Sequence, residues 1–176
     1  MIKTRDKLKR GGMDTIVAYI VVMIPLVYVL VFMIATLYHY TIQMSINQTV
    51  KETLIMASSY GTVTRSMIYD YMAPKMTKLV DGGFEIQFYV RELKDDGTVG
   101  TPVVANFDGD KKITYKNGQT LEKGDLLGIA VQSNNKSVLG SVSAFSLFGS
   151  NSDENNLYYS AYREEIIRNE RNEDTP

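Results

Sequence analysis

The sequence contains no cysteine and only one histidine among its 176 residues. Without cysteine the chain can form neither a disulfide nor a thiolate metal site, so its folded part depends on core packing, oligomerisation or assembly for stability. A catalytic or metal-binding role for the single histidine, His39, would need partners that the neighbouring sequence does not offer. We therefore expect no metal centre and no cofactor.

Residue patterns for catalysis and nucleotide binding are also missing. Neither Gly11-Gly12 nor Gly82-Gly83 belongs to a phosphate-binding pattern. Asp108-Gly109-Asp110 resembles a fragment of a calcium loop, but two lysines follow it, and the further oxygen ligands and terminal Glu of an EF-hand are absent. We expect a charged hairpin turn at this place and a protein that is not an enzyme.

Formal charge is absent from residues 15–50, and residues 16–38 form an almost unbroken apolar run. As a helix, this run of 23 residues would span roughly 35 Å, slightly more than the ~30 Å hydrocarbon core of a bilayer. Apolar residues cover every face of that helix, whereas a core helix of a soluble protein carries an apolar stripe. The run therefore predicts a transmembrane helix.

A secretory signal peptide is the main alternative, because it also begins with a basic region followed by an apolar stretch. Its apolar core is typically only ~7–15 residues long, shorter than the run seen here. No clear small-x-small cleavage site follows the run before the amphipathic sequence begins. These two differences favour a retained membrane anchor.

Basic residues gather on one flank of the apolar run, and they are Lys3, Arg5, Lys7, Lys9 and Arg10. The other flank carries no formal charge until Lys51 and Glu52. Because positively charged flanks stay in the cytoplasm, the sequence predicts a single-pass protein of the cell membrane with a cytoplasmic N-terminus and an extracellular C-terminal domain.

The charge of the remaining chain argues against nucleic-acid binding. The first 14 residues hold five of the 19 Lys and Arg and two of the 20 Asp and Glu, which leaves 14 basic and 18 acidic residues beyond Asp14. A nucleic-acid binder usually concentrates positive charge on its folded part. We expect the lipid bilayer and other proteins as partners, and no nucleic acid.

Pro25 lies inside the apolar run. A proline in a helix has no N–H group, so it removes one hydrogen bond and frees the carbonyl of Val21. The sequence predicts a helix kink at Pro25, since proline is fairly frequent in membrane helices. A helix built to bend or partly melt during assembly is the alternative interpretation.

Apolar residues continue at helical spacing beyond the run, at Ile42, Ile46, Val50 and Leu54. This pattern predicts that the membrane helix extends outward as an amphipathic stem, which packs either against the protein's own sheet or against a partner helix. We expect Gly61 and the region of residues 62–64 to interrupt the stem.

A second stretch of helical spacing follows, formed by Met67, Ile68, Tyr71, Met72, Met76 and Leu79. Pro74 is expected to break or terminate this stretch, and Asp81-Gly82-Gly83 ends whatever remains of it.

The period of the apolar pattern changes to that of a strand at Phe84, where Phe84, Ile86, Phe88 and Val90 alternate with polar residues. One apolar and one polar face are typical of a half-buried antiparallel strand. Further short strands are expected at residues 102–107, 113–116, 126–132, 138–145 and 157–162, with turns at Asp96-Gly97, Asp108-Gly109 and Asn117-Gly118. Together they predict an antiparallel sheet or a small sandwich.

The predicted fold class is therefore α+β, with a long N-terminal transmembrane and amphipathic helix followed by a small antiparallel β-sheet domain. The expected parts are a basic cytoplasmic leader at residues 1–12, a transmembrane helix at 13–40, an amphipathic helical stem at 41–82, an exported β domain at 83–162 and a charged C-terminal tail at 163–176. The segment from Glu164 onward is expected to be a frayed helix or a solvated tail.

The order of these parts resembles the type IV pilin-like proteins, especially the TadE-like minor pilins, or pseudopilins, of tight-adherence systems. The residues that carry the resemblance are Lys9-Arg10-Gly11-Gly12-Met13, the proline in Met23-Ile24-Pro25-Leu26, and the phrase at residues 124–131, Gly-Asp-Leu-Leu-Gly-Ile-Ala-Val. The resemblance covers the architecture of the whole chain, and its motifs are short.

The resemblance implies cleavage by a prepilin peptidase between Gly12 and Met13. Five places into the mature chain the family carries an acidic residue, whereas this sequence has Val17, and the nearest acid is Asp14. That departure fits an accessory or minor subunit, or an unprocessed membrane protein, better than the major subunit of a filament.

The resemblance also implies a function: a non-enzymatic, membrane-anchored structural or assembly subunit of a pilus, secretion or conjugation apparatus in a bacterium. Its partners would be other pilin-like or assembly subunits, contacted through the N-terminal helix. A membrane-tethered extracellular binding or sensor module is the alternative, and a membrane-tethered hydrolase is the weakest of the three interpretations.

Overall fold

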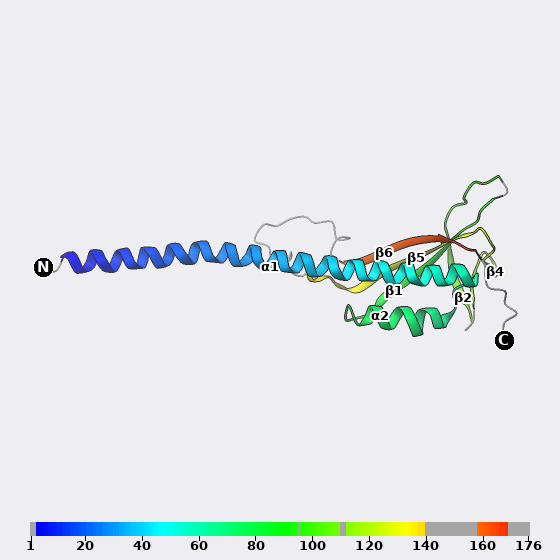
Figure 1. The fold of residues 1–176 in the computed structure, drawn as a ribbon, viewed down its shortest axis with the longest axis horizontal. Coiled ribbons are helices and arrows are strands. Elements are labelled where there is room, and N and C mark those ends of the chain that lie inside the picture. Colours follow the sequence, from blue (N-terminus) through cyan, green and yellow to red (C-terminus); the bar gives the residue numbers. More distant parts are fainter. Residues whose placement is uncertain (1–2, 95, 110–111, 140–157, 169–176) are drawn as a thin grey trace. The chain divides into compact units, whose positions relative to one another are not determined.

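A computed structural model describes residues 3–94, 96–109, 112–139 and 158–168, with side chains from residue 15 onward. The chain has a long N-terminal helix followed by a six-stranded antiparallel sheet, which confirms the α+β fold class (Figure 1). It divides into two compact units, Met1–Tyr38 and His39–Pro176, which we describe separately.

The helix α1 runs from Lys3 to Tyr60, so it forms the first unit and also the first element of the second. It continues through Pro25 and ends where the sequence predicts an interruption. Gly61 has a φ of 72°, a left-handed conformation that glycine adopts without steric cost, and its N–H bonds to the carbonyl of Ser58.

The second helical stretch consists of a π-helical segment, η1, from Met67 to Met72, followed directly by α2 from Ala73 to Thr77. The expectation that Pro74 breaks or terminates this stretch is wrong, because Pro74 lies in the first turn of α2. The Ala73 N–H bonds to the carbonyl of Ile68, five residues back, and a proline at the start of the next turn needs no N–H donor.

Within the described residues the strands form a single sheet and no sandwich. The six strands are β1 (Phe84–Arg91), β2 (Val103–Asp108), β3 (Lys112–Tyr115), β4 (Gln119–Thr120), β5 (Leu126–Lys136) and β6 (Tyr158–Ile166). Their order is β4-β3-β2-β1-β5-β6, and each neighbouring pair is antiparallel. Strands β1 to β4 follow one another as a meander, after which β5 returns to the other side of β1.

Three details of the sheet differ from expectation. The short strand β4 was not predicted; it follows the Asn117-Gly118 turn, where both residues have positive φ. Residues 138 and 139 are helical, and the rest of the expected strand at 138–145 lies outside the described residues. Strand β6 continues past Tyr162 to Ile166, because Glu164 and Glu165 pair with Gly128 and Leu127 of β5 instead of beginning a tail.

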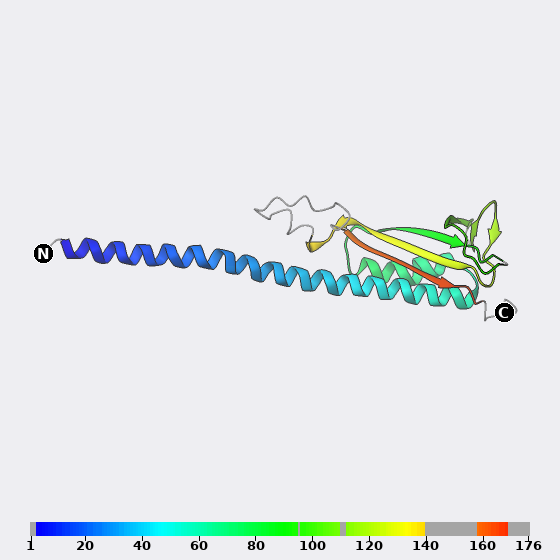
Figure 2. The same ribbon diagram turned by 90° about the horizontal axis from the view of Figure 1, so that it is seen from above.

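The core of the second unit lies between one face of the sheet and the helices (Figures 1 and 2). Alternate residues of the central strands are buried on that face, with Phe88, Val90, Leu127, Ile129 and Val131 as examples. The helices contribute Ile42, Ile46, Val50 and Leu54 from α1 and Ile68, Met72 and Met76 from η1 and α2. Packing of one-sided elements against each other fixes the stem on the sheet.

A clasp of two asparagines joins the end of the second helical stretch to β5. Asn134 Nδ2 donates to the Gly82 carbonyl at 2.8 Å, and Asn135 Nδ2 donates to the Asp81 carbonyl at 3.0 Å. Gly82 has a φ of 95°, and a Cβ at this position would lie 2.2 Å from Asn135 Nδ2. Glycine fits here because of its positive φ, and a larger residue would also displace the Asn135 amide from its bond to Asp81.

Candidate functional site

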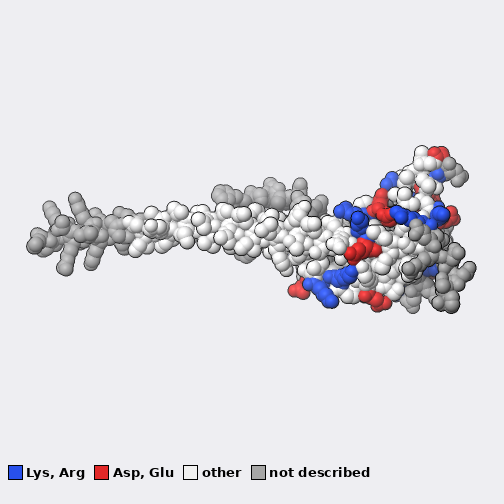
Figure 3. Space-filling view, viewed as in Figure 1, with Lys and Arg blue, Asp and Glu red and all other residues white. Residues whose placement is uncertain are grey.

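The first unit of the molecule is an apolar helix whose side chains are exposed on every side. From residue 15 to residue 38, all side chains except Ala35 are exposed, including Ile24 at 65% and Leu37 at 67%. Figure 3 shows a surface without Lys, Arg, Asp or Glu along this described stretch. An apolar surface of this size is unfavourable in water. It therefore needs lipid or apolar protein around it.

Within the described residues, one helix is long and apolar enough to cross a membrane, and it is this one. The prediction of a helix of membrane-spanning length and composition is therefore confirmed. The arrangement is compatible with a single-pass anchor, since a helix satisfies its own backbone hydrogen bonds in hydrocarbon.

The predicted site residues of the leader all lie on the helix α1. The backbone is helical at Gly12 and Met13, the expected cleavage position, and at the five basic residues Lys3, Arg5, Lys7, Lys9 and Arg10. Their side chains lie outside the described part of the chain. Cleavage and membrane orientation stay predictions.

Pro25 lies within α1 and borders a shallow groove on the helix surface. The groove is lined by Val22, Pro25, Leu26, Val29, Leu30 and Met33. The kink at Pro25 stays a prediction, whereas the groove gives the helix one face that differs in shape from the others.

The stem carries its buried apolar stripe as predicted, and the stripe packs against the protein's own sheet and second helical stretch. The side chains of Ile46 and Val50 are fully buried. Of the two interpretations offered for the stem, packing within the chain is thus confirmed for this stripe.

A second stripe on the stem consists of hydroxyl side chains, which the sequence interpretation missed. Ser45 Oγ donates to the Thr41 carbonyl at 3.0 Å, Thr49 Oγ1 to the Ser45 carbonyl at 2.9 Å, and Thr53 Oγ1 to the Thr49 carbonyl at 2.9 Å. Thr49 and Thr53 are buried. Because each hydroxyl is satisfied within its own helix, burial leaves no unpaired donor. The recurrence of Ser or Thr at every fourth position, from Thr41 to Thr53, is the sequence feature from which this stripe could have been predicted.

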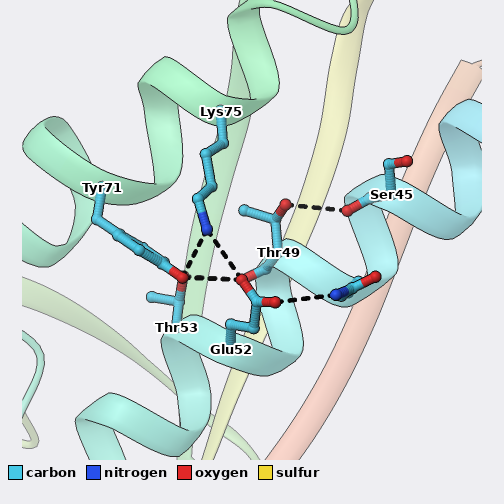
Figure 4. Close-up of polar contacts among 7 residues, drawn as sticks. Ser45, Thr49, Glu52, Thr53, Tyr71 and Lys75 are labelled. Atoms are coloured by element: carbon cyan, nitrogen blue, oxygen red, sulfur yellow. Dashed lines mark hydrogen bonds and ion pairs between the residues drawn. The ribbon is translucent and has the colours of Figure 1, made fainter.

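Glu52 connects the stem to the second helical stretch (Figure 4). Its Oε2 accepts from the Tyr71 hydroxyl at 2.8 Å and from Lys75 Nζ at 3.0 Å, while its Oε1 accepts from Gln48 Nε2 at 3.0 Å. Lys75 Nζ also lies 3.9 Å from the centroid of the Tyr71 ring. These contacts join residues that are distant in sequence, and they act as a surface clamp between α1 and the η1–α2 stretch.

The hydrogen bond from Tyr71, together with those from Lys75 and Gln48, lowers the pKa of Glu52 to about 2. The same cluster raises the pKa of Lys75, first through Tyr71 and then through Glu52. Both groups are therefore charged over the whole physiological range. A carboxylate and an ammonium held in this way stabilise a contact and are poorly suited to exchanging protons at neutral pH.

His39 begins the second unit and stacks on Tyr159, with ring centroids 4.9 Å apart and an interplanar angle of 20°. No group of three or more His, Asp or Glu that could hold a metal ion occurs among the described residues. Asp108 ends β2, Gly109 follows it in a turn, and Asp110 lies outside the described part. The structure therefore assigns His39 a packing contact.

A groove of about 360 Å³ opens where β1 and β2 diverge. Strand β1 pairs with β5 along its full length but with β2 only over residues 88–90, so no described residue pairs with 84–87 on the β2 side. Phe84, Phe88 and Phe107 line the groove together with Ile68 of η1. No residue pattern marks this fork, because it arises from pairing between distant strands.

Comparison with known proteins identifies no relative: no family model, no curated protein and no solved structure matches this chain. The resemblance to pilin-like proteins consequently depends on the order of the parts and on the short motifs in the sequence.

Proposed function

We propose that the chain is a non-enzymatic, single-pass membrane protein that serves as a pilin-like, TadE-like structural or assembly subunit of a pilus, secretion or conjugation apparatus. The observation that carries the proposal is the character of α1. One continuous helix exposes apolar side chains on every face over residues 15–38 and then buries an apolar stripe in the core of the second unit. A subunit that is first held by lipid and later by neighbouring helices needs such a surface.

In this proposal the basic leader stays in the cytoplasm and the second unit is exported to the cell surface. Before assembly, lipid covers residues 15–38; in an assembly, helices of neighbouring subunits take its place. The large exposed apolar area supports this double use, because the same surface is stable in either environment and unstable in water.

A prepilin peptidase is the proposed processing partner, with cleavage between Gly12 and Met13. The supporting features are the basic residues before this position and the apolar run after it. Removal of the leader would also remove the charges that hold the N-terminus in the cytoplasm, which would allow the helix to leave the bilayer during assembly.

The N-terminus of the protein recovered from membrane and sheared surface fractions tests the proposal. Mass spectrometry should find chains that begin at Met13, together with pilus or secretion components that co-purify. A Gly12→Leu variant should retain its leader, whereas the matched Gly11→Ala variant should be processed. An intact leader in every fraction, with no co-purifying assembly component, would contradict the proposal.

A membrane-tethered binding module is the second candidate, and the fork between β1 and β2 is the observation that favours it. The unpaired edge of residues 84–87 and the aromatic lining suit an extended peptide that adds a strand. Peptide display against the full chain in micelles should select binders that are lost in Phe107→Ala and retained in Tyr162→Ala, a change on the opposite face. Equal loss in both variants would contradict this function.

A further inference from the structure

Tyr28 places a hydroxyl group near the middle of the apolar helix. By helical rise it lies about 18 Å from Ile16 and about 15 Å from Tyr38, which is farther than a tyrosine side chain reaches. The structure shows no hydrogen bond from this hydroxyl to any described residue. In hydrocarbon an unpaired hydroxyl is strongly unfavourable, so Tyr28 requires an acceptor at this depth.

The helix offers one backbone acceptor close to that depth. Residue 25 is proline, so the Val21 carbonyl lacks the N–H donor that it would otherwise receive from four residues ahead. Within two helical turns the chain thus places a hydroxyl donor without a described partner and a carbonyl that has lost its usual helical donor, and their partial charges are complementary.

Donor and acceptor share one face of the helix. Seven residues turn an α-helix through about 700°, only about 20° short of two full turns, so Val21 and Tyr28 align, and Pro25 lies within about 40° of Val21. Helical side chains lean toward the N-terminus, which brings the Tyr28 hydroxyl toward the level of the Val21 carbonyl. Pro25 lies between them on the same helix, so a bond within one chain would have to pass the proline ring. Neighbouring helices commonly satisfy backbone groups that a proline frees in a membrane helix.

The apolar groove adjoins this face on the other side of Pro25. Its lining includes Val22, Pro25 and Val29, which form a shallow hollow beside the proline ring. Close packing of complementary surfaces drives helix association in lipid, so a hollow at the edge of this face leaves room for side chains of a neighbouring helix.

We infer that two copies of this chain pair in parallel within the membrane through the face formed by Val21, Pro25, Tyr28 and Phe32. The Tyr28 hydroxyl of each copy donates to the Val21 carbonyl of the other. A second copy is the matching partner because it inserts in the same orientation and presents the same donor and acceptor at the same depth. The inference rests on the membrane anchor of the proposed function and names the partner of that helix.

Disulfide cross-linking of the full chain in membranes tests the face. The protein has no cysteine, so Phe32→Cys introduces a single thiol on the pairing face. Ile34→Cys is its control, because Ile34 is exposed, lies outside the groove and is about 200° around the helix from Phe32. After oxidation, Phe32→Cys should give a covalent dimer at several times the yield of Ile34→Cys. Equal yields at both positions would overturn the inference.

A double-mutant cycle tests the hydrogen bond. Energy transfer between full-length chains in lipid vesicles, labelled at an exposed Thr101→Cys, reports their association. Tyr28→Phe removes the donor and should weaken association about threefold to thirtyfold per hydrogen bond. Tyr19→Phe, whose hydroxyl lies near the end of the apolar run, should leave it unchanged.

Pro25→Ala restores the backbone N–H that pairs with the Val21 carbonyl within the same helix. The carbonyl is then no longer free to accept a hydrogen bond from Tyr28 of the other copy. Because both changes delete the same bond, adding Tyr28→Phe to Pro25→Ala should weaken association little further. Independent, multiplying effects, or no effect of Tyr28→Phe, would overturn the inference.

Membrane extraction separates this inference from the proposed function. Retention of the chain in membranes after carbonate treatment, combined with unselective cross-linking, would overturn the pairing alone. Release of the chain by carbonate would overturn both the anchor and the pairing.

Discussion

The two parts of α1 on either side of residue 38 have similar apolar residues but opposite surroundings. Over residues 15–38 every side chain except Ala35 is exposed, whereas from Ile42 onward an apolar stripe is buried and most of the other positions are polar. Apolar content alone therefore does not define a core. A residue stabilises the fold only where other elements of the chain cover it.

The same substitution in both parts should give the largest contrast. Ile46→Asp places an unpaired charge at a fully buried position and should prevent the second unit from folding. Ile24→Asp, at a position 65% exposed, should leave that unit folded but cost about 2.5–3.5 kcal/mol of membrane insertion. Near-UV circular dichroism in micelles and the membrane-bound fraction measure the two effects. Loss of the folded second unit in Ile24→Asp would show that residues 15–38 also contribute to its core, which would contradict the contrast between the two parts.

Truncation of leucine gives a smaller version of the same contrast. Leu54 is 2% exposed, so Leu54→Ala should lower the free energy of unfolding of the second unit by about 2–5 kcal/mol. Leu30 is 52% exposed, and Leu30→Ala should leave that free energy unchanged within about 0.5 kcal/mol. Urea unfolding of both full-length variants in the same detergent provides the measurement. Equal losses would show that the two parts share one core.

The smallest effect concerns the clamp at Glu52. Its pKa in the folded state, about 2, lies below the ordinary value of 4.5, so its contribution to stability is present above pH 4.5 and is lost as the pH falls toward 2. Glu52→Gln should therefore be less stable than the unmodified chain at neutral pH, and the difference should shrink between about pH 4.5 and about 2. Thermal unfolding at a series of pH values measures it. A difference that is constant with pH would exclude the carboxylate as its source.

Features that depend on local periodicity could be predicted from the sequence. The apolar run, the stripe that includes Ile42 and Ile46, and the alternation that begins at Phe84 each repeat with the period of their own element. The left-handed Gly61 and the Asn117-Gly118 turn were equally accessible, because their conformations follow from the residue types.

Features that depend on contacts between distant residues could not be predicted. Glu52 meets Tyr71 and Lys75 only after the second helical stretch folds back along α1. The fork beside β1 depends on where the pairing with β2 stops. The position of Pro74 inside a helical stretch depends on a π turn, whose bond from Ala73 to Ile68 has no marker in the residue pattern.

The hydroxyl stripe of the stem bears on how deeply the helix sits in a bilayer. Residues 15–50 carry no charge, and as a helix they extend about 54 Å, well beyond the ~30 Å hydrocarbon layer. Ser45 and Thr49 satisfy their hydroxyls within the helix, so these two residues add little cost when the helix is buried. Gln43 is different, because its side-chain amide bonds to the Ser160 backbone of β6 and is satisfied in this way only after the sheet has folded onto the stem. Folding of the second unit therefore determines which part of the uncharged helix is left for lipid or for apolar partners.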